Sequence, residues 1–522
     1  MNFRIARWIA PIVLTCALVM VARTSAQEQN AKHHHYKLVD LGTFGGPNSG
    51  VNFEPFQNVI NNSGTVVGGA DTSSLTPVAG GFNPIGNQDF FVSHAFVWRG
   101  ESLEDLGTLP GGNFSFAAAI NQRGQIAGTS ENSQIDPASG NPEFRAVLWE
   151  NDKIRDLGTL GGTASFASAL NDLGQVTGVA LNGVPDPYSI LAIGDGTTST
   201  QTHGFLWQNG KMQDLGTLGG PDSFAIFTND RSQVAGVSYT NDIADPNTMV
   251  PPLEPFLWEN GKMKDLGNLG GTNGRLLGVG GLVNALNNFG QVAGAMELEG
   301  DQSFHAFLWN GQKLSDLGTL GGCCSAAEGI NDAGEVVGAT NLPADQATHG
   351  FLWRNGVMKD LGTVRVDPCT AALSINSKGQ VVGASESVAG GCNEWTTAVL
   401  WENGAPGVDL NALIPSGSGA HLFAAFWTND GGEIVAGGNP PVCDINATCA
   451  HAYVLIPCDD NHPDVQGCDY SFVAATTSVQ ALQNIQLPVP TSATKLSPTE
   501  MTTRFRSLMM RRNRKFGSAP RQ

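Results

Sequence analysis

The chain has 522 residues, of which 47 are acidic and 28 are basic, so its formal net charge is −19 at neutral pH. Such a charge repels a phosphate backbone, which excludes nucleic acid as a partner but leaves cations and basic molecules open.

Residues 1–26 have the pattern of a secretory signal. Two arginines precede an apolar run at 8–21, and small residues follow at 24–26. The apolar run is short for a membrane span, and no later segment is long enough to be one. We therefore predict a secreted protein, extracellular or periplasmic, without a membrane span. Cys16 then belongs to the discarded peptide.

Residues 27–35 form a polar stretch with three adjacent histidines, His33, His34 and His35. Three neighbouring imidazoles can contact a metal ion, but a flexible N-terminal linker accounts for them more simply. We predict a linker here and a first repeated strand that begins at Tyr36.

From 36 to 456 the chain repeats one unit eight times. The markers are an Asp-Leu step, a tight turn before a short apolar strand, and an aromatic residue that ends an apolar run. The Asp recurs at spacings of 44 to 65 residues. Asp40, Asp409 and Tyr453 are the outlying copies, and the central copies are Asp105, Asp156, Asp214, Asp265, Asp316, Asp360, Trp98, Trp149, Trp207, Trp258, Trp309, Trp353 and Trp401.

Each unit contains four short strands. The run 306–309 is continuously apolar, as expected of a strand covered on both faces. Asn-Gly at 209–210 predicts a hairpin into a second strand that alternates polar and apolar residues. A Gly-Gly connection leads to a small-residue strand such as 165–170, and an Asn-x-x-Gly turn at 171–174 precedes the fourth strand.

This pattern predicts an all-β fold, an eight-bladed β-propeller of four-stranded antiparallel blades. A parallel solenoid is the alternative, but the two tight turns of each unit favour antiparallel neighbours. The small-residue strand suits the crowded axis and the polar alternating strand suits the rim. The chain then begins with a rim strand, so strand 36–41 should complete the last blade beside 451–456 and close the ring.

The recurrent His-Ala-Phe-Leu-Trp at 305–309 and Asp-Leu-Gly-Thr-Leu-Gly-Gly at 156–162 resemble the HAF-type extracellular repeat family of bacteria. The resemblance covers about 36–456. It implies a secreted repeat protein, and it supplies no catalytic residue.

The long connections should all lie on one face of the ring, called here the long-loop face, and the tight turns on the opposite, short-turn face. Because function concentrates in loops that a rigid scaffold holds, the long-loop face is the predicted binding face. Its candidate binding residues are the non-repeated acids Asp89, Asp186, Asp195, Asp242 and Asp245. Calcium binding and an acid/base pair are the alternatives for these carboxylates, and loop solvation is the simplest interpretation.

Eight cysteines remain after the signal, an even number for a secreted chain. Their spacing suggests the pairs Cys443–Cys449, Cys458–Cys468, Cys369–Cys392 and the adjacent Cys323–Cys324. Zinc is the alternative for these sulfurs, but the sequence has no Cys-x-x-Cys. Residues 457–494 form a polar extension with one of the pairs. The basic segment 495–522 is predicted to be disordered.

The repeated Asp is best interpreted as an acceptor for backbone N–H groups at tight Gly turns, because a catalytic site needs residues that differ. No catalytic motif occurs. We predict a monomeric, non-catalytic binding or scaffold propeller without a cofactor, whose ligand is an extracellular protein or glycan. The alternative is a propeller enzyme, a glycan hydrolase or lyase, with carboxylates on the long-loop face.

Overall fold

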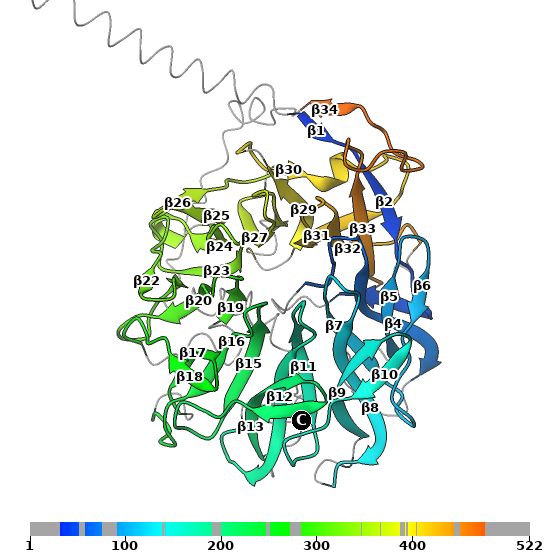
Figure 1. Cartoon of the computed structure of the whole chain (residues 1–522). Helices are drawn as coiled ribbons and strands as arrows, with labels where there is room; N and C mark the ends of the chain where they lie inside the picture. Colours follow the sequence, from blue (N-terminus) through cyan, green and yellow to red (C-terminus); the bar gives the residue numbers. More distant parts are fainter. Residues whose placement is uncertain are drawn as a thin grey trace, which may run out of the picture.

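Eight four-stranded antiparallel sheets surround a central axis as the blades of a propeller (Figure 1). The structure is a computed structural model that describes residues 32–474, apart from 52–57, 76–90, 138–139, 141, 190–199, 247–250, 272–282, 346, 366, 387–391, 393–394, 403 and 443–448. The predicted all-β, eight-bladed fold is confirmed. No helix in the described part of the chain is long and apolar enough to cross a membrane.

In blades 1 to 4 the chain runs from the inner strand to the rim. Blade 1 comprises β3 (Gly45–Gly50), β4 (Val66–Leu75), β5 (Phe91–Trp98) and β6 (Leu103–Asp105). Blade 2 comprises β7 (Ser115–Ile120), β8 (Ile126–Ile135), β9 (Pro142–Glu150) and β10 (Lys153–Asp156). Blade 3 comprises β11 (Ser165–Leu170), β12 (Val176–Pro185), β13 (Thr200–Gln208) and β14 (Lys211–Asp214). Blade 4 comprises β15 (Ser223–Thr228), β16 (Val234–Tyr239), β17 (Leu253–Glu259) and β18 (Lys262–Asp265).

Blades 5 to 7 repeat this order. Blade 5 comprises β19 (Val283–Leu286), β20 (Val292–Glu297), β21 (Phe304–Trp309) and β22 (Leu314–Asp316). Blade 6 comprises β23 (Ser325–Ile330), β24 (Val336–Asn341), β25 (Thr348–Arg354) and β26 (Val357–Asp360). Blade 7 comprises β27 (Cys369–Ile375), β28 (Val381–Glu386), β29 (Trp395–Trp401) and β30 (Val408–Asp409). Two short 3-10 helices, η1 (Pro343–Asp345) and η3 (Leu410–Ala412), lie in connections.

Blade 8 joins the two ends of the repeat region. Its inner strands are β31 (His421–Thr428), β32 (Ile434–Asn439) and β33 (His451–Pro457), and its rim strand is β2 (Tyr36–Asp40). Strands β2 and β33 are antiparallel, with Tyr36 opposite Pro457 and Asp40 opposite Tyr453. The predicted closure of the ring by the N-terminal strand is therefore confirmed.

The three histidines expected in a linker lie in ordered structure instead. Strand β1 (Lys32–His34) pairs with β34 (Phe472–Ala474) beside blade 8. The side chain of His33 is buried, and its Nδ1 lies 2.8 Å from Glu402 Oε1. The partners of β1 come more than 400 residues later, so local sequence gave no sign of this pairing.

Close backbone packing inside each blade explains a glycine that recurs in the second strand. A Cβ atom on Gly178 would lie 2.0 Å from the carbonyl oxygen of Phe166, and one on Gly236 would lie 2.0 Å from that of Phe224. No side chain fits at such a distance. The small-residue inner strand and the glycine of its neighbour therefore belong together.

A closed ring of hydrogen bonds joins all eight blades at the short-turn face. The asparagine that opens each short turn is buried, and its Nδ2 donates to the backbone carbonyl oxygen of the corresponding asparagine in the next blade at 2.8 to 3.2 Å. Its Oδ1 accepts the N–H of the residue four positions later, which closes its own turn. The ring consists of Asn61, Asn121, Asn171, Asn229, Asn287, Asn331, Asn376 and Asn429, and Asn429 donates back to Asn61.

Deletion of residues 27–40 should destabilise the propeller far more than deletion of 495–522. The first deletion removes the closing strand and the buried Tyr36, and leaves the edge of β33 unpaired. The single change Tyr36→Ala alone should lower the free energy of unfolding by about 3 kcal/mol. Thermal unfolding of both truncated chains measures this, and an equal loss in the two would contradict closure by β2.

Replacement of one ring asparagine by its acidic isostere should also destabilise the fold. In Asn287→Asp, the new carboxylate would face the carbonyl oxygen of Asn331, which loses its donor. We expect a loss of about 1–3 kcal/mol in urea unfolding. The matched control is Asn209→Asp in an exposed hairpin turn, where φ is 53° and Asp is tolerated. Equal effects of the two changes would contradict a stabilising ring.

Candidate functional site

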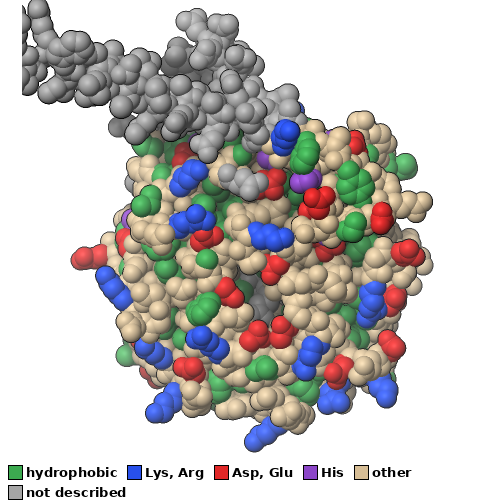
Figure 2. Space-filling model, turned by 45° about the horizontal axis from the view of Figure 1, so that its top comes forward, with side chains coloured by type: hydrophobic (Ala, Val, Ile, Leu, Met, Phe, Trp, Pro, Cys, Tyr) green, Lys and Arg blue, Asp and Glu red, His purple; other side chains and the backbone are tan. Residues whose placement is uncertain are grey.

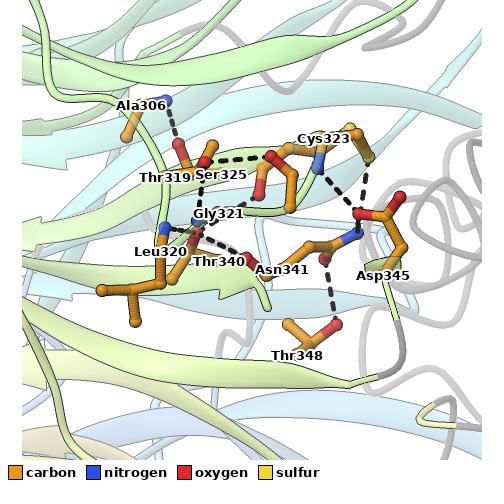
Figure 3. Close-up of a disulfide and its surroundings, with 12 residues drawn as sticks. Ala306, Thr319, Leu320, Gly321, Cys323, Ser325, Thr340, Asn341, Asp345 and Thr348 are labelled. Atoms are coloured by element: carbon orange, nitrogen blue, oxygen red, sulfur yellow. Dashed lines mark hydrogen bonds between the residues drawn. A yellow bond between two sulfur atoms is a disulfide. The ribbon is translucent and has the colours of Figure 1, made fainter. Parts of the chain in front are cut away.

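The repeated Asp-Leu-Gly-Thr-Leu-Gly-Gly connections build the framework of the long-loop face. Between blades 5 and 6, Asp316 Oδ1 accepts the N–H of Gly318 at 2.7 Å, and Ser325 Oγ donates to the Gly318 carbonyl oxygen at 2.6 Å. The same Ser325 Oγ accepts the N–H of Ala306 in the preceding blade at 2.8 Å (Figure 3). The motif thus ties the end of one blade to the start of the next.

All eight repeated aspartates accept a backbone N–H from the residue two positions later. The seven distances to glycine are 2.7 to 2.8 Å, and Asp409 accepts from Asn411 at 2.9 Å. The repeated tryptophans lie between the blades and are buried, except for the half-buried Trp353. Both sets of residues therefore have structural contacts.

Five of these aspartates also pair with a histidine on the third strand of the same blade. The Nδ1-to-carboxylate distances are 2.7 to 2.9 Å, and the pairs are His94–Asp105, His203–Asp214, His305–Asp316, His349–Asp360 and His451–Asp40. Sequence reasoning assigned the histidines a hydrogen-bonding role at strand ends but did not identify the aspartate as the partner. The spacing of 11 residues in four of the pairs was the signal.

The remaining blades replace the histidine with other residues. Arg145 takes its place in blade 2, where it binds Glu143 and lies 3.8 Å from Asp156. In blade 4 the position is Glu254, which accepts from Asn268 Nδ2 at 2.6 Å. In blade 7 the position is Thr397, and Arg365 from the connection before β27 lies 3.2 Å from Asp409. A basic side chain therefore lies within 4 Å of the repeated aspartate in seven of the blades.

Electrostatics in the histidine pairs favour the charged form of the aspartate. Partial burial raises the pKa of the Asp214 carboxyl, but the hydrogen bond from His203, the N–H of Gly216 and the charge of His203 outweigh burial and hold the pKa below its usual range. Burial lowers the pKa of His203, but its hydrogen bond to Asp214 and the charge of Asp214 outweigh burial and raise the pKa. The same balance lowers the pKa of Asp40, Asp105, Asp316 and Asp360.

The predicted binding acids have different positions. Asp89 and Asp195 lie outside the described residues. Asp242 is exposed and Asp245 is partly exposed in the connection between β16 and β17. Asp186 is buried, and its Oδ1 accepts the N–H of Tyr188 at 3.0 Å.

Asp186 belongs to a buried polar cluster between blades 3 and 4. Burial raises the pKa of Tyr239, and the charges of Asp222 and Asp186 raise it further. Asp222 is fully buried, and its Oδ1 accepts the N–H of Thr202 at 2.8 Å. Two carboxylates and a phenol thus lie close together, but covered from solvent. The sequence did not single out Asp222 as a candidate site residue, because it follows a Gly-Gly connection as an ordinary loop residue does.

A pocket of about 390 Å³ opens in blade 8. The connection that leads into this blade contains η3 and the glycine-rich stretch 416–419, where three other connections have Thr-Leu-Gly-Gly. Tyr453 stands where other blades carry Phe or Val, opposite Asp40. The lining residues are Leu38, Asp40, Pro415, Gly417, Ser418, Ala420, Pro441 and Tyr453.

Disulfides occur at three of the predicted pairs, Cys323–Cys324, Cys369–Cys392 and Cys458–Cys468. Cys449 is also in a disulfide, and Cys443, its predicted partner, lies outside the described residues. Within the described ranges, no group of three or more His, Cys, Asp or Glu side chains is arranged to hold a metal ion.

Acidic side chains also gather around the central hollow on the short-turn face (Figure 2). The residue after each ring asparagine is acidic in four blades, at Asp172, Asp230, Asp332 and Asp430. Their carboxylates accept backbone N–H groups from the preceding blade, as Asp172 does from Gln122 at 2.8 Å. Burial raises the pKa of Asp230, and the charges of Asp172 and Asp332 add to the effect. These acids reinforce the asparagine ring.

A scan against protein-family models gives no match, and a search of curated proteins gives none either. Similar solved structures include the β-propeller domain of the trilobed protease from Pyrococcus furiosus, with 10% identity over 72% of this chain and 98% of that chain and a TM-score of 0.38. Dipeptidyl peptidase 4 from Porphyromonas gingivalis has 10% identity over 74% and 58%, with a TM-score of 0.41. Oligogalacturonate lyase from Vibrio parahaemolyticus has 8% identity over 82% and 96%, with a TM-score of 0.36.

The His203–Asp214 pair should make stability depend on pH in two windows. Because the folded pKa of His203 is raised, its contribution is complete below the unfolded value of about 6.5 and is lost as pH rises through the folded pKa. Because the folded pKa of Asp214 is lowered, its contribution is complete above about pH 4 and is lost as pH falls through the folded pKa.

The free energy of unfolding, measured in urea, should therefore be lower at pH 8 than at pH 5. This decrease should be smaller in His203→Gln than in the unchanged protein. His421→Gln, at a histidine whose Nε2 contacts the backbone carbonyl oxygen of Thr396, is the control. An NMR titration that places His203 below its ordinary pKa would contradict this account.

Proposed function

We propose that the chain is a secreted, non-catalytic binding propeller of the HAF-type repeat family, whose long-loop face holds an extracellular protein or glycan. The observation that carries the proposal is the contrast between repeated and non-repeated groups on that face. The repeated carboxylates are held by backbone N–H groups and by basic side chains. The features that differ between blades, a pocket and two disulfides, lie on the same face and are available for specific contacts.

The pocket in blade 8 supports a small contact area with mixed chemistry. Asp40 offers a carboxylate that is ionised at neutral pH because its pKa is lowered, and Gly417 and Ser418 offer backbone groups. Leu38, Pro415 and Pro441 supply apolar walls. A carboxylate beside apolar surface suits a ligand that presents hydroxyl or amine donors next to a ring or side chain. Glycans and peptides both have this character.

The alternative of a glycan hydrolase or lyase needs two carboxylates that reach the scissile bond. Asp186 and Asp222 are two described non-repeated acids that lie near the same phenol, Tyr239, and both are buried. A turnover screen tests this alternative directly. Saturable turnover that a single Asp222→Asn change abolishes would replace the binding proposal with an enzymatic one.

A bulky side chain in the pocket should abolish ligand binding. We expect Ser418→Trp to weaken binding to any ligand found on glycan and peptide arrays by at least about tenfold, because the indole fills the pocket. The matched control is Leu173→Trp, which adds an indole to an exposed position on the short-turn face. Circular dichroism of both variants verifies folding. Binding that survives Ser418→Trp but fails in Leu173→Trp would move the ligand to the short-turn face.

A further inference from the structure

The bridge between Cys323 and Cys324 differs from the other disulfides in what it can contribute to the fold. The sequence separations are 1 residue for Cys323–Cys324, 10 for Cys458–Cys468 and 23 for Cys369–Cys392. A disulfide stabilises a fold mainly by closing a loop in the unfolded chain, and adjacent residues close no loop. A disulfide that stabilises the fold is in turn made harder to reduce by folding. Because this bridge closes no loop, folding does not protect it against reduction in this way.

The adjacency of the two cysteines also disfavours the geometry of an ordinary disulfide. Neighbouring Cα atoms are about 3.8 Å apart across a trans peptide, whereas ordinary disulfides have Cα atoms at least about 4.4 Å apart. The bridge therefore closes a tight ring that includes a peptide bond. Disulfides in tight or exposed settings are the ones that exchange most easily.

The bridge is joined to a turn on the long-loop face. The backbone N–H of Cys323 donates to Asp345 Oδ1 at 2.7 Å, and Asn341 Nδ2 lies 3.4 Å from Cys323 Sγ (Figure 3). Asn341 Nδ2 also donates to Asp345 Oδ1 at 3.2 Å, and its Oδ1 accepts from Thr348 Oγ1 at 3.1 Å. Both carboxylate contacts hold the turn at 342–345, called here the Asp345 turn.

The Asp345 turn depends on these contacts because its backbone is unfavourable. Ala344 has φ of 62° and Asp345 has φ of 52°, both in the left-handed region that costs an ordinary side chain free energy. A turn of this kind persists only while its surroundings hold it. The contact between Asn341 Nδ2 and Cys323 Sγ, whose position the disulfide ring fixes, is one of those restraints.

The two sulfurs differ in access. Cys324 is fully buried, whereas Cys323 is partly exposed at the entry to blade 6. A soluble thiol can therefore approach the Cys323 sulfur, and Cys324 is the leaving group. Blade 3 has Thr163 and Ala164 at the corresponding place, so the propeller framework does not need a bridge there.

We propose that Cys323–Cys324 is a site of reversible thiol–disulfide exchange that sets the state of the Asp345 turn. A thiolate of a dithiol reductant attacks Cys323 Sγ, the bond between the two sulfurs breaks, and Cys324 leaves as a thiolate that takes up a proton. The second thiol of the reductant then displaces Cys323. The products are two cysteine thiols and the oxidised reductant, after transfer of two electrons. The reduced pair no longer fixes the Cys323 sulfur against Asn341, and the Asp345 turn is released.

The test uses the oxidised, secreted full-length chain under native conditions. Graded dithiothreitol, alkylation and peptide mass spectrometry should label Cys323 and Cys324 at least about tenfold faster than Cys369, Cys392, Cys458 and Cys468. Hydrogen exchange at 341–348 should rise in the same samples while the strands of blades 1 to 4 keep their protection. Reoxidation should restore the original exchange.

The matched variant is Cys323→Thr with Cys324→Ala, which installs the pair that blade 3 carries. It should fold, and its exchange at 341–348 should equal that of the reduced protein with or without reductant. Labelling of Cys323 and Cys324 no faster than that of Cys458 and Cys468 would overturn the proposal. Reduction of the unmodified chain that leaves hydrogen exchange at 341–348 unchanged would also overturn it. This second outcome does not depend on whether the variant folds.

Discussion

The hydrogen-bonded ring of asparagines is the interaction on which the arrangement of the blades depends. Each amide works twice, since Oδ1 closes its own turn and Nδ2 reaches the turn of the next blade. The accepting carbonyl groups are buried, so the loss of a ring hydrogen bond leaves a polar group with neither a protein partner nor water. The last member, Asn429, donates to Asn61 at 2.9 Å. The ring is thus closed by side-chain chemistry at one face as well as by strand β2 at the rim.

The opposite face is built from a second set of repeated contacts, and this division explains where specificity can arise. Eight aspartates hold glycine-rich connections, and most of them also pair with a basic side chain. Such contacts are alike in every direction around the axis and cannot distinguish one ligand from another. Asymmetry comes from the pocket in blade 8, the disulfides and the long connections, all of which the repeated framework supports.

Repetition also explains how much the sequence could predict. Eight copies of three markers were enough for the blade count, the strand order and the closure by Tyr36 to Asp40, because each copy confirms the others. The placement of His33 failed because its partner, Glu402, is distant in the chain and unique. Asp186 looked like a loop acid, yet it is covered by its neighbours, and burial at a non-repeated site has no periodic signature. The asparagine ring was visible only as a turn signal, since contacts between blades depend on the closed ring.

The described disulfides and the pocket lie in the last three blades and in the extension that follows them. Blades 1 to 5 contain no cysteine, whereas disulfides lie at the entries to blades 6 and 7 and in the extension after β33. The extension is held further by Cys458, whose N–H donates to the carbonyl oxygen of His35 at 2.8 Å, and by the pairing of β1 with β34. The ring closes where β2 pairs with β33, and no covalent bond joins these two strands. Their separation opens the ring while the other blades keep their strands paired, so we expect the ring to open first at this seam. Covalent loops beside that seam restrict the opened state, so the same sector can carry an irregular pocket without weakening the ring.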